Sequence, residues 1–181
     1  MNPILKQLLN FIIILSVQIF LLNDIVIKSS ILLFGIPVFI PLIYPLFLLL
    51  LPLNTSHWGT LILGFVTGIT MDVFSNTPGM HAAACVLLAY MRPYLLNLFF
   101  QQNIRDLGNI YPTLFQMGFR SFLLYIGFAV LIHHLFFYSI QIWSFKNILY
   151  IILKTVLSSV FSILLIILSQ LLFAKREIRR A

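Results

Sequence analysis

Charged residues are scarce in this chain. They make up 8% of its 181 residues, and only four of them are acidic, whereas about a quarter of the residues in a soluble domain are charged. An enzyme needs a nucleophile with its base, or two carboxylates at one depth, and this inventory offers little of either. Hydrophobic residues make up 61% of the chain, and the mean hydropathy is +1.08. We therefore expect a protein that folds in lipid and has no catalytic activity of its own.

Cysteine is almost absent as well. Cys85 is the single one, which excludes an intrachain disulfide. The adjacent His133 and His134 point to different helical faces, and no cysteine or carboxylate accompanies them, so we expect no metal and no cofactor. The two histidines are assigned instead to an aromatic belt at the outer membrane interface. The other members of this belt are Phe136, Phe137, Tyr138 and Trp143.

Six apolar segments occupy almost the whole chain, and about 20 residues are enough to span the hydrocarbon layer. No small-x-small cleavage pattern follows the first segment, so we expect it to be retained. The second contains four prolines, which must kink a helix or break it into two halves. We predict an all-α integral membrane protein with about six transmembrane helices in one bundle and one domain. The segments are residues 4–22, 31–53, 58–74, 80–98, 113–138 and 147–173.

The positions of lysine and arginine predict the orientation, because cytoplasmic flanks of membrane helices retain more of both. Six crossings place Lys6, Arg105 and the basic residues of 175–180 on one side, and Lys28 and Lys146 on the other. We expect both termini in the cytoplasm and the protein in a bacterial inner membrane. The net charge of +7 then faces anionic lipids. It is not attributed to nucleic-acid binding.

The third segment has an informative spacing. Gly64, Gly68 and Asp72 are four residues apart, so they lie on nearly one helical face. Small residues let a neighbouring helix approach closely, which is how helices associate in lipid. The neighbour is either another helix of this chain or a transmembrane helix of a partner, and we expect the partner to dock here.

A turn joins the third and fourth segments. Thr77 is predicted as the N-cap of the next helix, with Pro78 at its first position. Asp72 and His81 then lie at similar depth on either side of the turn, where they can share a hydrogen bond. Such a pair either holds the two helices together or relays protons. We expect the structural role, because the pair has no second carboxylate beside it.

Arg92 and Arg120 lie several residues inside the cytoplasmic ends of the fourth and fifth segments, and Gln116 shares a face with Arg120. Either both arginines snorkel to the membrane surface, or their guanidinium groups converge on a lipid phosphate or an acidic group of a partner. Lys154, in the sixth segment, is expected to snorkel outward towards Lys146.

These residues resemble those of a known family, the rod shape-determining protein MreD. The matching elements are Gly64-x-x-x-Gly68-x-x-x-Asp72, a short turn, Thr77-Pro78-Gly79-Met80-His81-Ala82 and Ala89-Tyr90. Asn76-Thr77-Pro78-Gly79 and Tyr90-Met91-Arg92-Pro93 are similar to the Bacteroidetes-type version. The proline-rich segment and the basic tail extend the resemblance over nearly the whole chain. We assign Gly64, Gly68, Asp72, Gly79 and His81 to a helix–helix or partner interface.

The resemblance implies a non-enzymatic subunit of the cell-elongation machinery, which directs peptidoglycan synthesis and rod shape. Its expected partners are an MreC-like single-pass membrane protein and, through it, MreB, RodA and a peptidoglycan transpeptidase. It also implies a six-helix fold similar to the substrate-binding subunits of energy-coupling-factor vitamin transporters. No catalytic residue carries over.

A transporter subunit of that type, with a small-molecule site between its outer helix ends, is the alternative function. Such subunits typically dock their partner through alanine pairs four residues apart in the first helix. Residues 8–22 contain no alanine, and this absence favours the scaffold.

Overall fold

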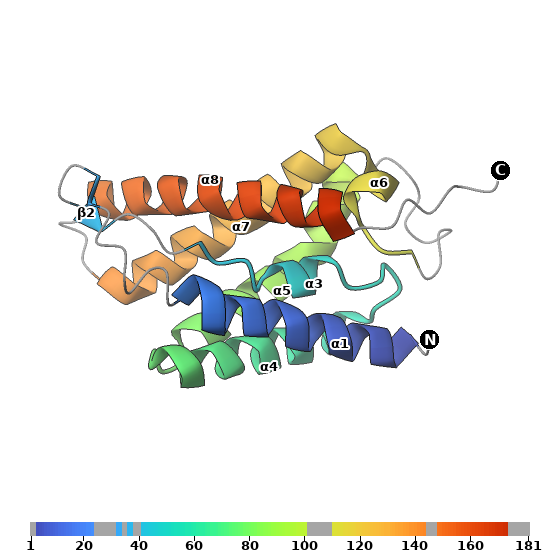
Figure 1. Cartoon of the computed structure of the whole chain (residues 1–181), viewed down its shortest axis with the longest axis horizontal. Coiled ribbons are helices and arrows are strands. Elements are labelled where there is room, and N and C mark those ends of the chain that lie inside the picture. Colours follow the sequence, from blue (N-terminus) through green and yellow to red (C-terminus); the bar gives the residue numbers. More distant parts are fainter. Residues whose placement is uncertain are drawn as a thin grey trace.

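The computed structural model describes residues 3–23, 32–33, 36–37, 41–100, 110–143 and 148–173. Long helices dominate it (Figure 1). They are α1 (Pro3–Ser16), which continues as the π-helix η1 (Val17–Leu22), α4 (His57–Ser75), α5 (Met80–Phe99), α7 (Phe119–Ile142) and α8 (Ile148–Phe173). The short elements are α3 (Leu46–Leu49), α6 (Leu114–Met117) and two antiparallel strands, β1 (Leu32–Leu33) and β2 (Ile36–Pro37).

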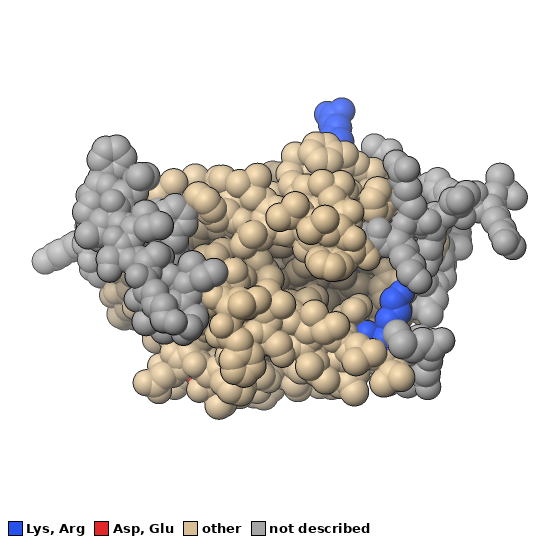
Figure 2. Space-filling view, in the orientation of Figure 1, with Lys and Arg blue, Asp and Glu red and all other residues tan. Residues whose placement is uncertain are grey.

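Five helices of the described residues are long and apolar enough to cross a membrane. They are Leu5–Leu22, His57–Ser75, Met80–Phe99, Phe119–Ile142 and Ile148–Phe173. Large hydrophobic side chains cover their outward faces, and the face in Figure 2 is almost free of charge. The charged residues of the described part are Lys6, Asp72, Arg92, Arg120 and Lys154. The chain is therefore an all-α, multi-pass membrane protein, whereas the predicted count of six helices is not confirmed.

Helices α1 and α4 run in the same direction. Asn23, which follows η1, donates a hydrogen bond to Ser75, the last residue of α4 (Nδ2 to Oγ 3.4 Å). The chain between them must therefore return along the bundle. We call the end where α1 begins the first end, and the end where α4 stops and α5 begins the second end. Helix α8 finishes at the first end, as Figure 1 shows.

The described part of this return, residues 41–53, passes through the core of the bundle and is called the proline segment. It replaces the helix predicted over residues 31–53, part of which lies outside the described residues. The proline segment forms only the one-turn helix α3, and most of its side chains are buried. Pro41, Pro45 and Pro52 have no backbone N–H, so a continuous helical hydrogen-bond ladder cannot form.

Side chains from η1 and α8 bind the backbone where the proline segment starts. Gln18 donates from Nε2 to the Pro41 carbonyl (3.1 Å) and accepts at Oε1 from the Ile43 N–H (2.7 Å). The Ser162 hydroxyl oxygen accepts from the Leu42 N–H (2.9 Å). A backbone group left without a partner in lipid costs several kcal/mol. These contacts therefore make the irregular backbone possible at membrane depth.

Side chains from α5 and α7 bind the other half of the proline segment. The Tyr125 hydroxyl donates to the Leu49 carbonyl (3.0 Å). The Arg92 guanidinium donates to the carbonyls of Leu51 and Pro52. Four helices thus supply the hydrogen bonds that a regular helix would have made within itself.

The remaining helices pack in chain order, α4 against α5, α5 against α7 and α7 against α8. Gly118 separates α6 from α7 with φ +78°, a conformation that favours glycine. The segment predicted as one helix over residues 113–138 is therefore divided, and α7 continues to Ile142.

Candidate functional site

The face formed by Gly64 and Gly68 packs against α5 of the same chain. A Cβ atom on Gly68 would lie 2.3 Å from Ala82 Cα, and one on Gly64 would lie 3.0 Å from Ala89 Cβ. Both distances are shorter than ordinary van der Waals contact, so α4 and α5 touch almost backbone to backbone. The expectation that a partner helix docks directly on these glycines is therefore wrong, because α5 already fills the space.

Asp72 caps the N-terminus of α5 from the last turns of α4. Its Oδ1 accepts hydrogen bonds from the Thr77 hydroxyl (3.0 Å) and the His81 backbone N–H (2.9 Å). Its Oδ2 accepts one from the Ala82 N–H (2.9 Å). The first N–H groups of a helix have no partner within the helix, and negative charge is favourable there. Asp72 and His81 do meet, but through the backbone of His81 and not through its imidazole.

Helix α5 begins at Met80, with Gly79 as its N-cap at φ +81°. The prediction that Thr77 is the N-cap and Pro78 the first helical residue is wrong. The Thr77 hydroxyl donates to Asp72 instead of accepting from the helix. The Asp72 carboxylate, although more distant from α5 in the sequence than Thr77 is, caps the helix in its place.

The His81 imidazole belongs to a buried group of polar side chains. The Tyr44 hydroxyl lies 2.7 Å from His81 Nδ1 and 2.9 Å from His133 Nε2. Phe137 stacks on the His81 ring, with 4.3 Å between the centroids. We call Tyr44, His81, His133, His134 and Ser162 the polar core. It joins the proline segment to α5, α7 and α8.

One hydroxyl proton determines the directions of the hydrogen bonds in the polar core. Tyr44 can donate to one imidazole and must accept from the other, so His81 and His133 have different roles. His133 Nδ1 is buried without a hydrogen-bond partner, and a buried N–H is left unpaired less often than an acceptor. This favours His133 donating from Nε2 to Tyr44, and Tyr44 donating to His81 Nδ1.

His134 connects the polar core to α8. Its ring nitrogens lie 2.9 Å from the Val130 carbonyl and 3.1 Å from the Ser162 hydroxyl. His133 and His134 are both fully buried, so their assignment to an outer aromatic belt is wrong. Helix α7 is packed between α5 and α8, and two adjacent faces can therefore both be internal. Trp143 of the predicted belt is exposed.

Helix α8 contributes a stripe of small polar residues that our sequence analysis overlooked. Thr155, Ser158, Ser159 and Ser162 are buried and recur at spacings of three and four residues. Tyr138 donates to the Ser158 hydroxyl (2.9 Å). The helical period on an otherwise apolar segment was the signal that could have revealed this face.

Lys154 is also buried against α7. Its Nζ donates to Gln141 Oε1 (3.3 Å) and lies 4.7 Å from the centre of the Tyr138 ring. Lys146, towards which we expected the Lys154 side chain to snorkel, lies outside the described residues. The ammonium group is held by an amide and an aromatic face.

The two arginines do not converge. Arg92 is 3% exposed and binds the proline segment, whereas Arg120 is exposed. Gln116 lies in α6, and the break at Gly118 separates it from Arg120. The predicted pair of guanidinium groups is therefore not formed, and only Arg92 points into the bundle.

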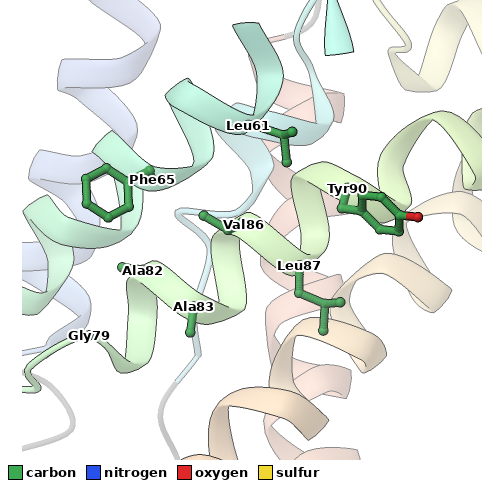
Figure 3. A pocket seen from close by; sticks show the side chains of 8 residues that line it. All are labelled: Leu61, Phe65, Gly79, Ala82, Ala83, Val86, Leu87 and Tyr90. Carbon is green, nitrogen blue, oxygen red and sulfur yellow. The ribbon is translucent and has the colours of Figure 1, made fainter. Parts of the chain in front are cut away.

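An apolar groove of about 620 Å³ runs along the edge of the contact between α4 and α5. Figure 3 shows Leu61 and Phe65 on α4 and the other lining residues along α5, with Gly79 at one end of the row and Tyr90 at the other. We call this the α4–α5 groove. Between its ends, α5 contributes Ala82, Ala83, Val86 and Leu87.

The described residues contain no group of three or more His, Cys, Asp or Glu side chains that could hold a metal ion. No protein-family model, curated protein or solved structure matches this chain. The resemblance to MreD therefore depends on the motif residues themselves.

Proposed function

We propose that this chain is a non-enzymatic scaffold subunit of the inner-membrane machinery for cell elongation, and that it docks an MreC-like single-pass membrane protein. The α4–α5 groove is the observation that carries the proposal. Gly64 and Gly68 bring α4 and α5 together, and the groove runs along the edge of their contact. Gly64 and Gly68 thus build a docking surface without lining it themselves, whereas Gly79, Ala82 and Tyr90 of the resembling motif lie along it.

The groove suits one apolar transmembrane helix. Ala83 and Val86 are partly exposed along it, and the rings of Phe65 and Tyr90 are 53% and 48% exposed at its edges. Helices in lipid associate where small residues allow close approach, because lipid chains are as apolar as the side chains. A partner helix would replace lipid along Ala83 and bury both aromatic edges.

Within the machinery, the chain connects through this partner to MreB, RodA and a peptidoglycan transpeptidase. We assign the first end of the bundle to the cytoplasm. Lys6 lies there over the Tyr111 ring (4.6 Å to its centre), and the segments that carry Arg105 and the basic tail leave the described helices at that end. Basic flanks stay in the cytoplasm and attract anionic lipids. A phosphatase fused after Ala181 should be inactive, and high activity would reverse the assignment.

Co-purification tests the docking surface. Ala83→Leu fills the groove and should reduce recovery of the single-pass partner about tenfold, which corresponds to roughly 1.4 kcal/mol. Gly127→Leu is the matched control, because it adds similar bulk to α7 at a position with no atom within 4 Å of the new Cβ. Both variants should melt like the parent in detergent. Equal recovery from Ala83→Leu and Gly127→Leu would remove the groove as the docking site.

The polar core favours a second function, a small-molecule-binding subunit of an energy-coupling-factor-type transporter. Its hydroxyl and imidazole groups could bind a polar ligand in the half of the bundle near the second end. Native mass spectrometry of the purified chain distinguishes the two roles. A small molecule that is retained by the parent and lost from Tyr44→Phe, with partner recovery unchanged, would make the transporter role the better account.

A further inference from the structure

A small pocket lies near the first end, where α4 begins beside the last turns of α5. Its volume is about 100 Å³. Arg92 and Thr60 are buried in its wall, whereas His57 and Asn97 are exposed at its mouth. Leu53, Pro93 and Leu96 line the apolar part of the wall.

The positive charge in this pocket has no counterion among the described residues. Arg92 donates to the carbonyls of Leu51 and Pro52 and has the neutral Tyr125 hydroxyl as a further hydrogen-bond partner, whereas its Nε is buried without a partner. Asp72, the one acidic residue of the described part, caps α5 at the second end. A buried ion without an opposite charge is strongly destabilising, so the site is suited to an anion from outside the chain.

The N-terminus of α4 adds to the positive potential. Ser56 accepts from the Gly59 N–H (3.1 Å) and, at its carbonyl, from the Thr60 N–H (2.9 Å). The N–H groups of His57 and Trp58, in the same turn, have no partner within the helix. A helix N-terminus attracts anions through these groups and its dipole, and here it meets the buried guanidinium.

We propose that this pocket binds one phosphate group, presented by the headgroup of an anionic membrane lipid. The pocket opens near the end of α5, where Tyr94 and Leu98 are 56% and 71% exposed and can contact acyl chains. Inorganic phosphate shares the chemistry of the headgroup but not these apolar contacts. This inference is independent of the scaffold role, because it requires no protein partner.

Thermal melts of the delipidated, detergent-solubilised chain test the site with three added probes: phosphatidylglycerol, inorganic phosphate and diacylglycerol. Phosphatidylglycerol should raise the melting temperature by a few degrees and saturate. Diacylglycerol should have no effect. If inorganic phosphate alone gives the full rise in melting temperature, the phosphate group does not have to come from a lipid headgroup. If neither phosphatidylglycerol nor inorganic phosphate raises the melting temperature, the pocket is not a phosphate site.

Asn97→Asp is the sharpest variant, because it places a carboxylate at the mouth with almost no change in shape. It should raise the melting temperature without lipid and abolish the response to phosphatidylglycerol. Asn54→Asp is the matched control, since Asn54 is exposed near the same end but does not line the pocket. Asn54→Asp should leave the response to phosphatidylglycerol unchanged. An equal effect of both variants would show that the response depends on general surface charge and not on this pocket.

Arg92→Gln should abolish the lipid response as well, and Arg120→Gln should preserve it. Arg92→Gln also weakens the contacts to the proline segment, so its result is read together with Asn97→Asp. Asp106 lies outside the described residues and is tested directly. If Asp106→Asn creates a lipid response that the parent lacks, Asp106 is the counterion and the proposal is wrong.

Discussion

The α4–α5 hairpin has an outward apolar face, whereas the proline segment is buried in the core, and the two satisfy their backbones in opposite ways. The hairpin consists of two continuous helices whose backbone hydrogen bonds are internal except at Pro93 in α5, so it needs only small residues to bring the helices together and one carboxylate to cap α5. The proline segment keeps internal backbone hydrogen bonds only around the short helix α3, and it receives others from the side chains of Gln18, Arg92, Tyr125 and Ser162.

The difference changes how buried polar residues are interpreted in this protein. Ionisable or polar side chains inside a membrane bundle are often functional. In this protein several buried polar side chains have a structural role, because they replace the missing helical hydrogen bonds of the proline segment. Arg92, whose Nε has no hydrogen-bond partner and whose side chain lines the small pocket near the first end, is the residue that still points to a ligand.

Substitution of Gly68 should have the largest effect. Gly68→Leu places Cβ 2.3 Å from Ala82 Cα, and backbone cannot move aside as a side chain can. Separation of α4 from α5 should cost about 3 kcal/mol or more and reduce the yield of monodisperse protein on size exclusion. Gly127→Leu should be tolerated. Normal stability of Gly68→Leu would show that the hairpin is not held by this contact.

Gln18→Leu tests the other region. The change leaves the Pro41 carbonyl and the Ile43 N–H without partners and should cost about 2 kcal/mol in thermal or denaturant melts. Gln170→Leu is the control, because Gln170 is similarly buried but its Oε1 has no hydrogen-bond partner. Equal losses from the two variants would mean that volume, and not the hydrogen bonds, matters at Gln18.

The cap on α5 should show a graded response. Asp72→Leu removes three acceptor contacts and should cost about 2 kcal/mol. Asp72→Asn keeps one acceptor for His81 but turns an N–H group towards Ala82, so it should be milder, about 1 kcal/mol. Melting temperatures of the two variants give the order. Complete loss of function in a stable, well-expressed Asp72→Asn protein would favour a proton-linked role.

Tyr44→Phe should have the smallest effect on stability. It removes the hydroxyl between His81 and His133 and should cost about 1 kcal/mol, because polar contacts between membrane helices contribute little on average. Partner recovery should be unchanged. Loss of partner recovery at normal stability would connect the polar core to docking and contradict the division between the two regions.

Sequence patterns predicted the elements better than their contacts. The face with Gly64 and Gly68 was evident from spacing, and its neighbour was not, because a groove of small residues looks the same to a partner helix as to α5. Asp72 was placed near His81, but the choice between imidazole and backbone depends on the path of the turn. His133 was assigned to the membrane interface because aromatic residues follow it in the sequence, and such residues are typical of an interfacial belt.

The sequence by itself determined that this protein folds in lipid, because continuous apolar runs leave helices as the way to satisfy the backbone there. It predicted six membrane-spanning segments, and five of them correspond to helices long and apolar enough to cross a membrane. It also determined that prolines would interrupt the second segment. Only the tertiary structure decided where the backbone of the proline segment finds its partners. That outcome could not be predicted locally, because Gln18, Arg92, Tyr125 and Ser162 lie on four different helices and reach the segment only when the bundle has closed.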